Sequence, residues 1–193
     1  PISPYLFIII ADVLQRLIRH DHELCHPLLP DAPAVVLQYA DDTLIIMRAC
    51  GRGAARLKLL LDQFAEATGL VINFAKSTLI PMHADADVVE QVVAALGCAA
   101  GVFPQSYLGL PLSWEKLRFA DFLPMIAKVD MYLAGWAARL LSPVGRLVLI
   151  NAVLDALPTY AMAALLLPSA VIRALDELRR SFLWNVAERA TGA

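Results

Sequence analysis

The feature that most constrains the fold is a pair of adjacent carboxylates in the stretch QYADDTLII, residues 38–46. Asp41 and Asp42 lie between two apolar or β-branched runs, Val35–Tyr39 and Thr43–Met47. Two such runs around a short polar segment are typical of a strand–turn–strand hairpin. A turn takes adjacent side chains out of the alternation of a strand. We therefore predict a hairpin whose Ala-Asp-Asp turn displays both carboxylates on one accessible side.

The composition is that of a folded protein. The chain has 193 residues, of which 59% are apolar, enough to bury the core of one large or two small domains. Its longest strongly apolar stretches, Tyr5–Ile10 and Ala161–Leu167, are shorter than the roughly 18 residues of a membrane-spanning helix. Three cysteines, an odd number, favour reduced thiols in an intracellular protein. We expect no disulfide framework and no membrane span.

Two further features concern context. The chain begins at Pro1 with no basic segment and cleavage site, so we expect a piece of a longer protein without a signal peptide. The net charge of −2 provides no global attraction to nucleic acid. The acids predominate in the first hundred residues, whereas bases predominate after residue 138.

Helical periodicity predicts three helices before residue 100. The first begins at Ser3-Pro4, an N-cap followed by proline, and the other two end at Gly69 and Gly97. The expected helices are 3–19, 51–68 and Asp87–Leu96, and the expected strands beyond the hairpin are Leu70–Phe74, Thr78–Met82 and Ser106–Leu112. The apolar face expected for the first helix consists of Leu6, Ile10, Val13, Leu14 and Leu17.

The character of the chain changes near Trp114. The helical blocks that follow are separated by prolines and comprise Phe119–Leu140, Val144–Leu157 and Ser169–Val186. We expect a mixed α+β part over 1–112 and an all-α part over 113–193. One helix face in the second part, expected to be buried, consists of Leu147, Ile150, Leu154 and Leu157.

The adjacent carboxylates suggest a metal site. Two carboxylates held close together repel each other unless a cation lies between them, and oxygen ligands suit magnesium. The alternative is an ordinary β-turn, because aspartate is a favoured turn residue. A second candidate is HDHELCH, residues 20–26, in which His20, His22, Cys25 and His26 are all competent zinc ligands. A surface loop is favoured there, because structural zinc sites draw ligands from two separated elements.

Several blocks in collinear order resemble a known family. QYADDTLII is similar to the YADD hairpin of reverse transcriptases, and the helix before it and the lysine-bearing motif after it occur in the same order. The further blocks are similar to LINE-type reverse transcriptases, those of non-LTR retrotransposons common in plant genomes. The quoted blocks are SPYLFIIIADVLQRLI (3–18), GLVINFAKSTLI (69–80), YLGLPL (107–112), GWAARLLSPVGRLVLINAVLDALPTY (135–160) and LRRSFLW (178–184).

The resemblance implies a fold and a set of site residues. The α+β part would be the carboxyl part of a polymerase palm, and the helical part a thumb-like region. Asp41 matches the family's metal-binding aspartate, with Asp42 beside it as a supporting carboxylate. Tyr39 would lie next to the primer end, and Lys76 near the leaving pyrophosphate. The strand pair that grips the primer would include Tyr107, Leu108 and Gly109.

Alternatives remain open for two of these residues. Tyr39 is also compatible with an ordinary strand aromatic, and Lys76 with a solvated turn lysine.

The resemblance also implies ligands and partners. The complete enzyme would use Mg²⁺, an RNA template, a DNA primer and deoxynucleoside triphosphates, and the complete retrotransposon protein would be intracellular and nuclear. The family's site needs a further aspartate from an earlier strand, which this chain lacks, so we expect the chain by itself to be inactive. The alternative is a catalytically dead remnant, or an interaction module that keeps the palm–thumb fold.

Overall fold

The computed structural model describes residues 2–133, 141–154 and 156–184. The fold is mixed α+β, with helices and three two-stranded sheets. The chain divides into two compact units, Pro1–Val102 and Phe103–Ala193. This division precedes the boundary expected near residue 113, because Leu110 packs against the helical core of the second unit. In the described ranges, no helix is both long and apolar enough to cross a membrane.

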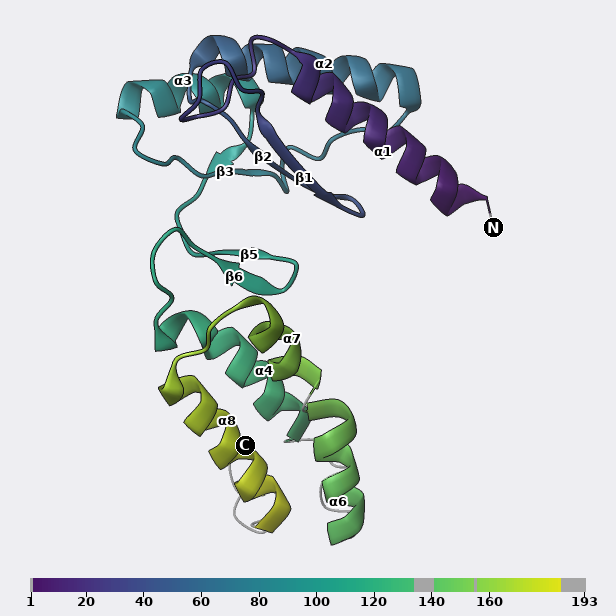
Figure 1. The fold of residues 1–193 in the computed structure, drawn as a ribbon, viewed down its shortest axis with the longest axis vertical. Coiled ribbons are helices and arrows are strands. Elements are labelled where there is room, and N and C mark those ends of the chain that lie inside the picture. The colour runs from purple at the N-terminus through teal and green to yellow at the C-terminus, as the bar shows by residue number, and fades with distance from the viewer. Residues whose placement is uncertain (1, 134–140, 155, 185–193) are drawn as a thin grey trace. The chain divides into compact units, whose positions relative to one another are not determined.

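The first unit is built from helices around a β-hairpin. Figure 1 shows α1 and α2 along one side of the hairpin formed by β1 and β2. A short parallel pair, β3 with β4, follows. In chain order the elements are α1 (Ser3–His20), β1 (Val35–Tyr39), β2 (Asp42–Ile46), α2 (Gly51–Thr68), β3 (Thr78–Leu79), α3 (Ala86–Leu96) and β4 (Ala99–Ala100).

The two faces of the β1–β2 hairpin differ in burial. The strands are antiparallel, with Val36 opposite Ile45 and Leu37 opposite Leu44. Val36 is buried and Ile45 packs against the same core, whereas Leu37 on the other face is 48% exposed. The buried face contacts residues of α1 and α2 that include Leu14, Ile18, Leu57, Leu60, Leu61 and Phe64.

Helix α2 forms as its sequence predicts. Cys50 caps its N-terminus, because the Sγ atom accepts a hydrogen bond from the Gly53 amide. Gly69 ends it in the left-handed conformation, at φ 75°, which glycine adopts without a Cβ penalty. Its buried apolar residues include Leu57, Leu60, Leu61 and Phe64, which share one helix face.

Helix α1 has nearly the expected extent, but only part of its expected apolar face is buried. Leu14 and Ile18, one turn apart, are its buried residues. Leu6, Val13 and Leu17, which were expected in the core, are exposed. The core of this unit contacts α1 along Ile10, Leu14 and Ile18, which are spaced four residues apart on one helix face. Leu6 lies before this line and Val13 and Leu17 lie beside it, so apolar periodicity identified the helix but not the face that is covered.

An ion pair joins the loop between α1 and β1 to α2. Asp21 accepts a hydrogen bond from Arg56 at 2.7 Å, and its side chain is only 8% exposed. Leu24 is fully buried, and its carbonyl accepts a hydrogen bond from the Ala34 amide. These contacts fix the chain just before it enters β1.

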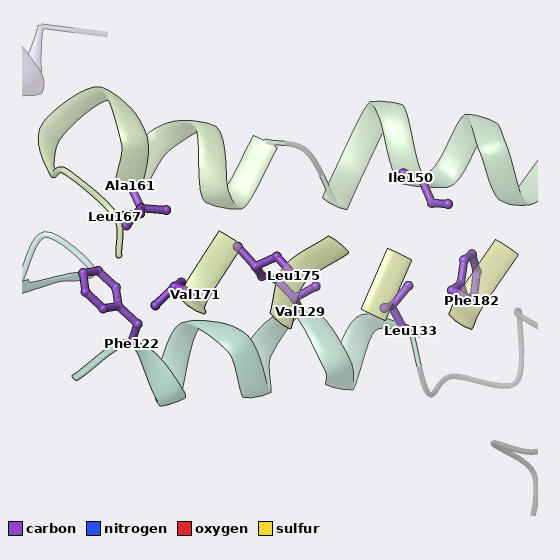
Figure 2. Close-up of a cluster of buried hydrophobic side chains, with 9 residues drawn as sticks. All are labelled: Phe122, Val129, Leu133, Ile150, Ala161, Leu167, Val171, Leu175 and Phe182. Carbon is purple, nitrogen blue, oxygen red and sulfur yellow. The ribbon is translucent and has the colours of Figure 1, made fainter. Parts of the chain in front are cut away.

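The second unit is a helical assembly that carries one hairpin. Figure 2 shows side chains from α4, α7 and α8 pointing toward one another in its core. The described elements are β5 (Gln105–Tyr107), β6 (Leu110–Leu112), a 3-10 helix η1 (Phe119–Phe122), α4 (Leu123–Leu133), α6 (Pro143–Leu149), a π-helical turn η2 (Ile150–Leu154), α7 (Ala156–Ala164) and α8 (Ser169–Trp184). Both strands of this hairpin precede residue 113, and the described elements after it are helical, as expected for 113–193.

Two local predictions are wrong. Residues 70–74 form no strand, and the strand expected over Thr78–Met82 is reduced to Thr78–Leu79.

In the second unit, the helix face expected to be buried is only partly so: Ile150 is buried, but Leu147 is 47% exposed. The α-helix ends at Leu149 and continues as a π-helical turn, so the helical spacing that grouped these positions on one face is interrupted. The side chains of Leu154 and Leu157 lie outside the described residues.

The turn of the β1–β2 hairpin generates a first prediction. Ala40 is exposed and has φ 52°, a left-handed conformation that costs an L-residue roughly 1–2 kcal/mol. Glycine avoids that cost, so Ala40→Gly should stabilise the hairpin by up to about 1 kcal/mol, measured by amide hydrogen exchange across β1–β2.

The matched control is Ala55→Gly. Ala55 is also exposed but lies inside α2, where the same substitution should destabilise by about 1 kcal/mol. Equal destabilisation by both substitutions would contradict the left-handed turn.

Candidate functional site

The two aspartates lie at the tip of the β1–β2 hairpin. Tyr39 pairs with Asp42, which leaves Ala40 and Asp41 as a two-residue turn. Asp41 and Asp42 are exposed, and Tyr39 is 64% exposed. The predicted hairpin is confirmed, with its first strand as expected. The second strand begins at Asp42 rather than Thr43, so the turn is shorter by one residue than expected.

The strand pairing places Tyr39 and Asp42 on one face. Residues directly opposite in an antiparallel pair project to the same side of the ribbon. This face also carries the Leu37–Leu44 pair, because side chains alternate along each strand. The opposite face is buried through Val36. The burial of one face therefore directs the Tyr39 ring and the Asp42 carboxylate away from the core.

The chemistry of the turn fits a magnesium ion only in part. Asp41 and Asp42 supply hard oxygen ligands, and magnesium is usually bound through one or two carboxylates together with waters and substrate phosphates. Among the residues that the structure describes, no group of three or more His, Cys, Asp or Glu could hold a metal ion. The turn can thus contribute two carboxylates to a site whose other ligands come from elsewhere.

Lys76 lies in a turn between α2 and β3. The Asn73 side chain accepts a hydrogen bond from the Lys76 amide at 3.2 Å, and the Asn73 carbonyl accepts from the Lys76 and Ser77 amides. The Lys76 side chain is exposed. In the described part of the chain, no ion pair joins Lys76 to Asp41 or Asp42. The lysine and the carboxylates share the first unit but are not in direct contact.

Tyr107, Leu108 and Gly109 belong to the second unit. Tyr107 pairs with Leu110, so Leu108 and Gly109 form a two-residue turn between β5 and β6. The single strand predicted from the pattern over 106–112 is therefore a hairpin, as the family resemblance implied. Both turn residues are left-handed, with φ 51° for Leu108 and 78° for Gly109. For glycine this conformation is favourable, whereas for leucine it costs roughly 1–2 kcal/mol.

One contact at this hairpin was missed from the sequence. The Tyr160 hydroxyl donates a hydrogen bond to the Leu108 carbonyl at 2.9 Å. The two residues are 52 positions apart, and a polar side chain that follows a proline in a helical block gives no local signal for such a partner. Only the packing of α7 in the second unit reveals it.

The histidine-rich loop uses its polar atoms locally. His26 accepts hydrogen bonds from the Leu28 and Leu29 amides through Nδ1. The Cys25 thiol donates to the His22 carbonyl at 3.4 Å, and His20 Nδ1 lies 2.8 Å from the Arg16 carbonyl. These contacts shape the loop, and its residues form no metal-binding group within the described ranges.

Helix α8 has a buried apolar stripe and a charged face. Val171, Leu175 and Phe182 are buried. On the charged face Asp176 pairs with Arg179 at 3.2 Å. Because this ion pair neutralises one of the arginines of α8, the exposed side of the helix is a solvated face of mixed charge and not a continuous basic surface.

Comparison with known proteins gives one partial similarity. The chain matches none of the known protein-family models. Over 76 residues it is 35% identical to an Arabidopsis thaliana protein named "Putative ribonuclease H protein". The match covers 39% of this chain and 12% of that protein. The chain is therefore similar to a small part of a much longer relative.

The exposed carboxylates generate a second prediction. Mn²⁺, a paramagnetic substitute for Mg²⁺, should broaden amide signals around residues 39–43 selectively. Asp41→Asn and Asp42→Asn should each weaken this binding by roughly tenfold, a change of about 1.4 kcal/mol, because each removes one of two anionic ligands. Neither should alter stability by more than about 0.5 kcal/mol, since both residues are exposed.

Asp87→Asn is the control for this titration. Asp87 is an exposed carboxylate in the first turn of α3, and its removal should leave the broadening at residues 39–43 unchanged. Broadening spread evenly over surface acids, or unaffected by Asp41→Asn, would show that the turn holds no metal.

Proposed function

We propose that this chain is part of the reverse transcriptase of a LINE-type, non-LTR retrotransposon, an RNA-directed DNA polymerase. The observation that carries the proposal is the exposed Asp41–Asp42 pair at the tip of a hairpin, beside the exposed ring of Tyr39. Residues 1–102 would form the carboxyl part of the palm. The helices of the second unit would form the thumb-like region, with the β5–β6 hairpin beside the primer.

Each site residue has a role in this proposal. Asp41 and Asp42 would hold Mg²⁺, which in polymerases activates the primer 3′-hydroxyl and clamps the triphosphate. Tyr39, on the same hairpin face as Asp42, would pack against the sugar at the primer end. Lys76 would neutralise or protonate the leaving pyrophosphate. Tyr107, Leu108 and Gly109 would contact the primer strand.

Two further features support a role with nucleic acid. The named relative is a ribonuclease by its name, and ribonucleases are enzymes of nucleic acids. The six blocks that resemble reverse transcriptases also extend over nearly all of the chain, from residue 3 to residue 184. A chance YADD tetrapeptide would not be accompanied by the other five blocks in the same order.

A second candidate is a non-catalytic remnant or interaction module. It is favoured by the apolar surface of α1, where Tyr5, Ile8 and Ile9 are each more than 60% exposed. Contiguous exposed apolar surface marks interaction sites. The upstream reading frame distinguishes the candidates, because an in-frame strand with a further aspartate supports the polymerase and stop codons support the remnant.

Primer extension tests the proposed activity. The 193-residue chain should give no extension with an RNA template, DNA primer, Mg²⁺ and deoxynucleotides, because two carboxylates cannot by themselves fix two metal ions. It would also lose the positioning of the triphosphate, which is worth roughly 7–11 kcal/mol of barrier in favourable cases. A longer protein that includes the upstream aspartate and nucleotide-binding segment should extend the primer.

The longer protein then allows the decisive substitution. Asp41→Ala should abolish its extension activity, whereas Asp87→Ala, at an exposed acid on α3, should leave it intact. Extension that survives Asp41→Ala would place the catalytic metal somewhere else.

A further inference from the structure

The Tyr160 hydroxyl connects two distant parts of the second unit. It donates to the carbonyl of Leu108 at 2.9 Å, and so links α7 to the turn between β5 and β6. Figure 1 shows α7 next to this hairpin. Tyr160 is itself 51% exposed, and it is not among the residues of the buried cluster.

The donor is held by the core of the unit. Ala161, the next residue, is fully buried, and Pro158 is among the most buried side chains. Ala161 packs in the same cluster as Val171 of α8 and Val129 of α4, as Figure 2 shows. The packing of Pro158 and Ala161, on either side of Tyr160 in the sequence, therefore fixes the position of the Tyr160 backbone. A backbone held in this way keeps the hydroxyl near the turn.

The hairpin is attached to that core at a second place. Leu110, the first residue of β6, packs against the same cluster. The turn is thus attached to the core on one side by the packing of Leu110. On the other side it is attached to α7 by the hydrogen bond from Tyr160 to the Leu108 carbonyl. Gly109 lies between the two attachments and is exposed. Among the described residues nothing lies within 4 Å of the position where a Cβ on Gly109 would stand, so its backbone is open to approach.

The bonded carbonyl belongs to a strained residue. Leu108 has φ 51°, and a bulky side chain persists in this region only when the surrounding structure holds it there. Nothing in the sequence around a Leu-Gly turn supplies that restraint. The Tyr160 hydroxyl supplies it directly, because it binds the peptide group that Leu108 shares with Gly109.

We propose that Tyr160 is a positioning residue of the primer-binding hairpin, holding the Leu108–Gly109 turn so that the Gly109 backbone faces the primer strand. The inference rests on the proposed function, because it assumes that the hairpin contacts a primer. Tyr160 touches no reacting group itself. It acts through the turn, whose shape decides whether a nucleic-acid backbone can approach Gly109.

The first test is independent of nucleic acid. Tyr160→Phe removes only the hydroxyl, and should accelerate amide exchange of Leu110 and Tyr107 by roughly two- to twelvefold, the loss of one neutral hydrogen bond. Tyr132→Phe is the matched control, because Tyr132 lies on α4 in the same unit with 49% exposure. It should leave hairpin exchange unchanged. Equal exchange rates in wild type and Tyr160→Phe would overturn the inference.

The second test measures binding of an RNA–DNA duplex with a recessed 3′ end. Tyr160→Phe should weaken binding by roughly two- to twelvefold, whereas Tyr132→Phe should not. Faster exchange without weaker binding would show that Tyr160 only supports the fold, and would overturn its positioning role. If the wild-type chain did not bind the duplex at all, the proposed function would fail, while the exchange result would still report on the hydrogen bond.

Discussion

The register of the β1–β2 hairpin is the constraint on which the candidate site depends. Side chains alternate with a period of two along a strand, so a slip of one residue would exchange the buried and exposed faces. Burial of Val36 against α1 and α2 selects one register. That register places Tyr39 opposite Asp42 and leaves Asp41 in a two-residue turn. The apolar core thus fixes the position of the carboxylates without touching them.

The two units share one structural feature, a hairpin turn that contains a non-glycine residue in the left-handed conformation. In each unit an apolar core holds a two-stranded hairpin whose two-residue turn begins with a non-glycine residue at positive φ, Ala40 in the first and Leu108 in the second. Such residues cost free energy, persist where the surroundings impose them, and concentrate at functional sites. In the first unit one face of the strands is buried against the core, and in the second the Tyr160 hydroxyl donates a hydrogen bond to the Leu108 carbonyl in the turn. Both turns carry residues assigned to the site by the family resemblance.

The sequence predicted those elements whose signals are local. The hairpin around the aspartates and the helix ending at Gly69 follow from alternation, periodicity and caps, and each is present. Burial was harder to predict, because it depends on which neighbour covers an element. Leu17 fits the periodicity of α1 but is exposed, since the core contacts the neighbouring line of Ile10, Leu14 and Ile18. Leu147 was expected in the core but is exposed, and the continuous helix expected over 144–157 changes to a π-helical turn at Ile150. The contact of Tyr160 with Leu108 has no sequence signal at all. The roles of the site residues come from the family resemblance and remain predictions.

The central claim is that Asp41 and Asp42 hold a divalent metal at the primer terminus. Fe²⁺ can replace Mg²⁺ among oxygen ligands, and with a reductant and peroxide it generates hydroxyl radicals that cleave nucleic acid near the metal. The direct measurement is the cleavage pattern of a recessed RNA–DNA duplex bound to the chain. The account predicts cleavage confined to the last nucleotides of the primer, lost in Asp41→Asn and retained in Asp87→Asn. Cleavage spread along the duplex, or unchanged by Asp41→Asn, would contradict it.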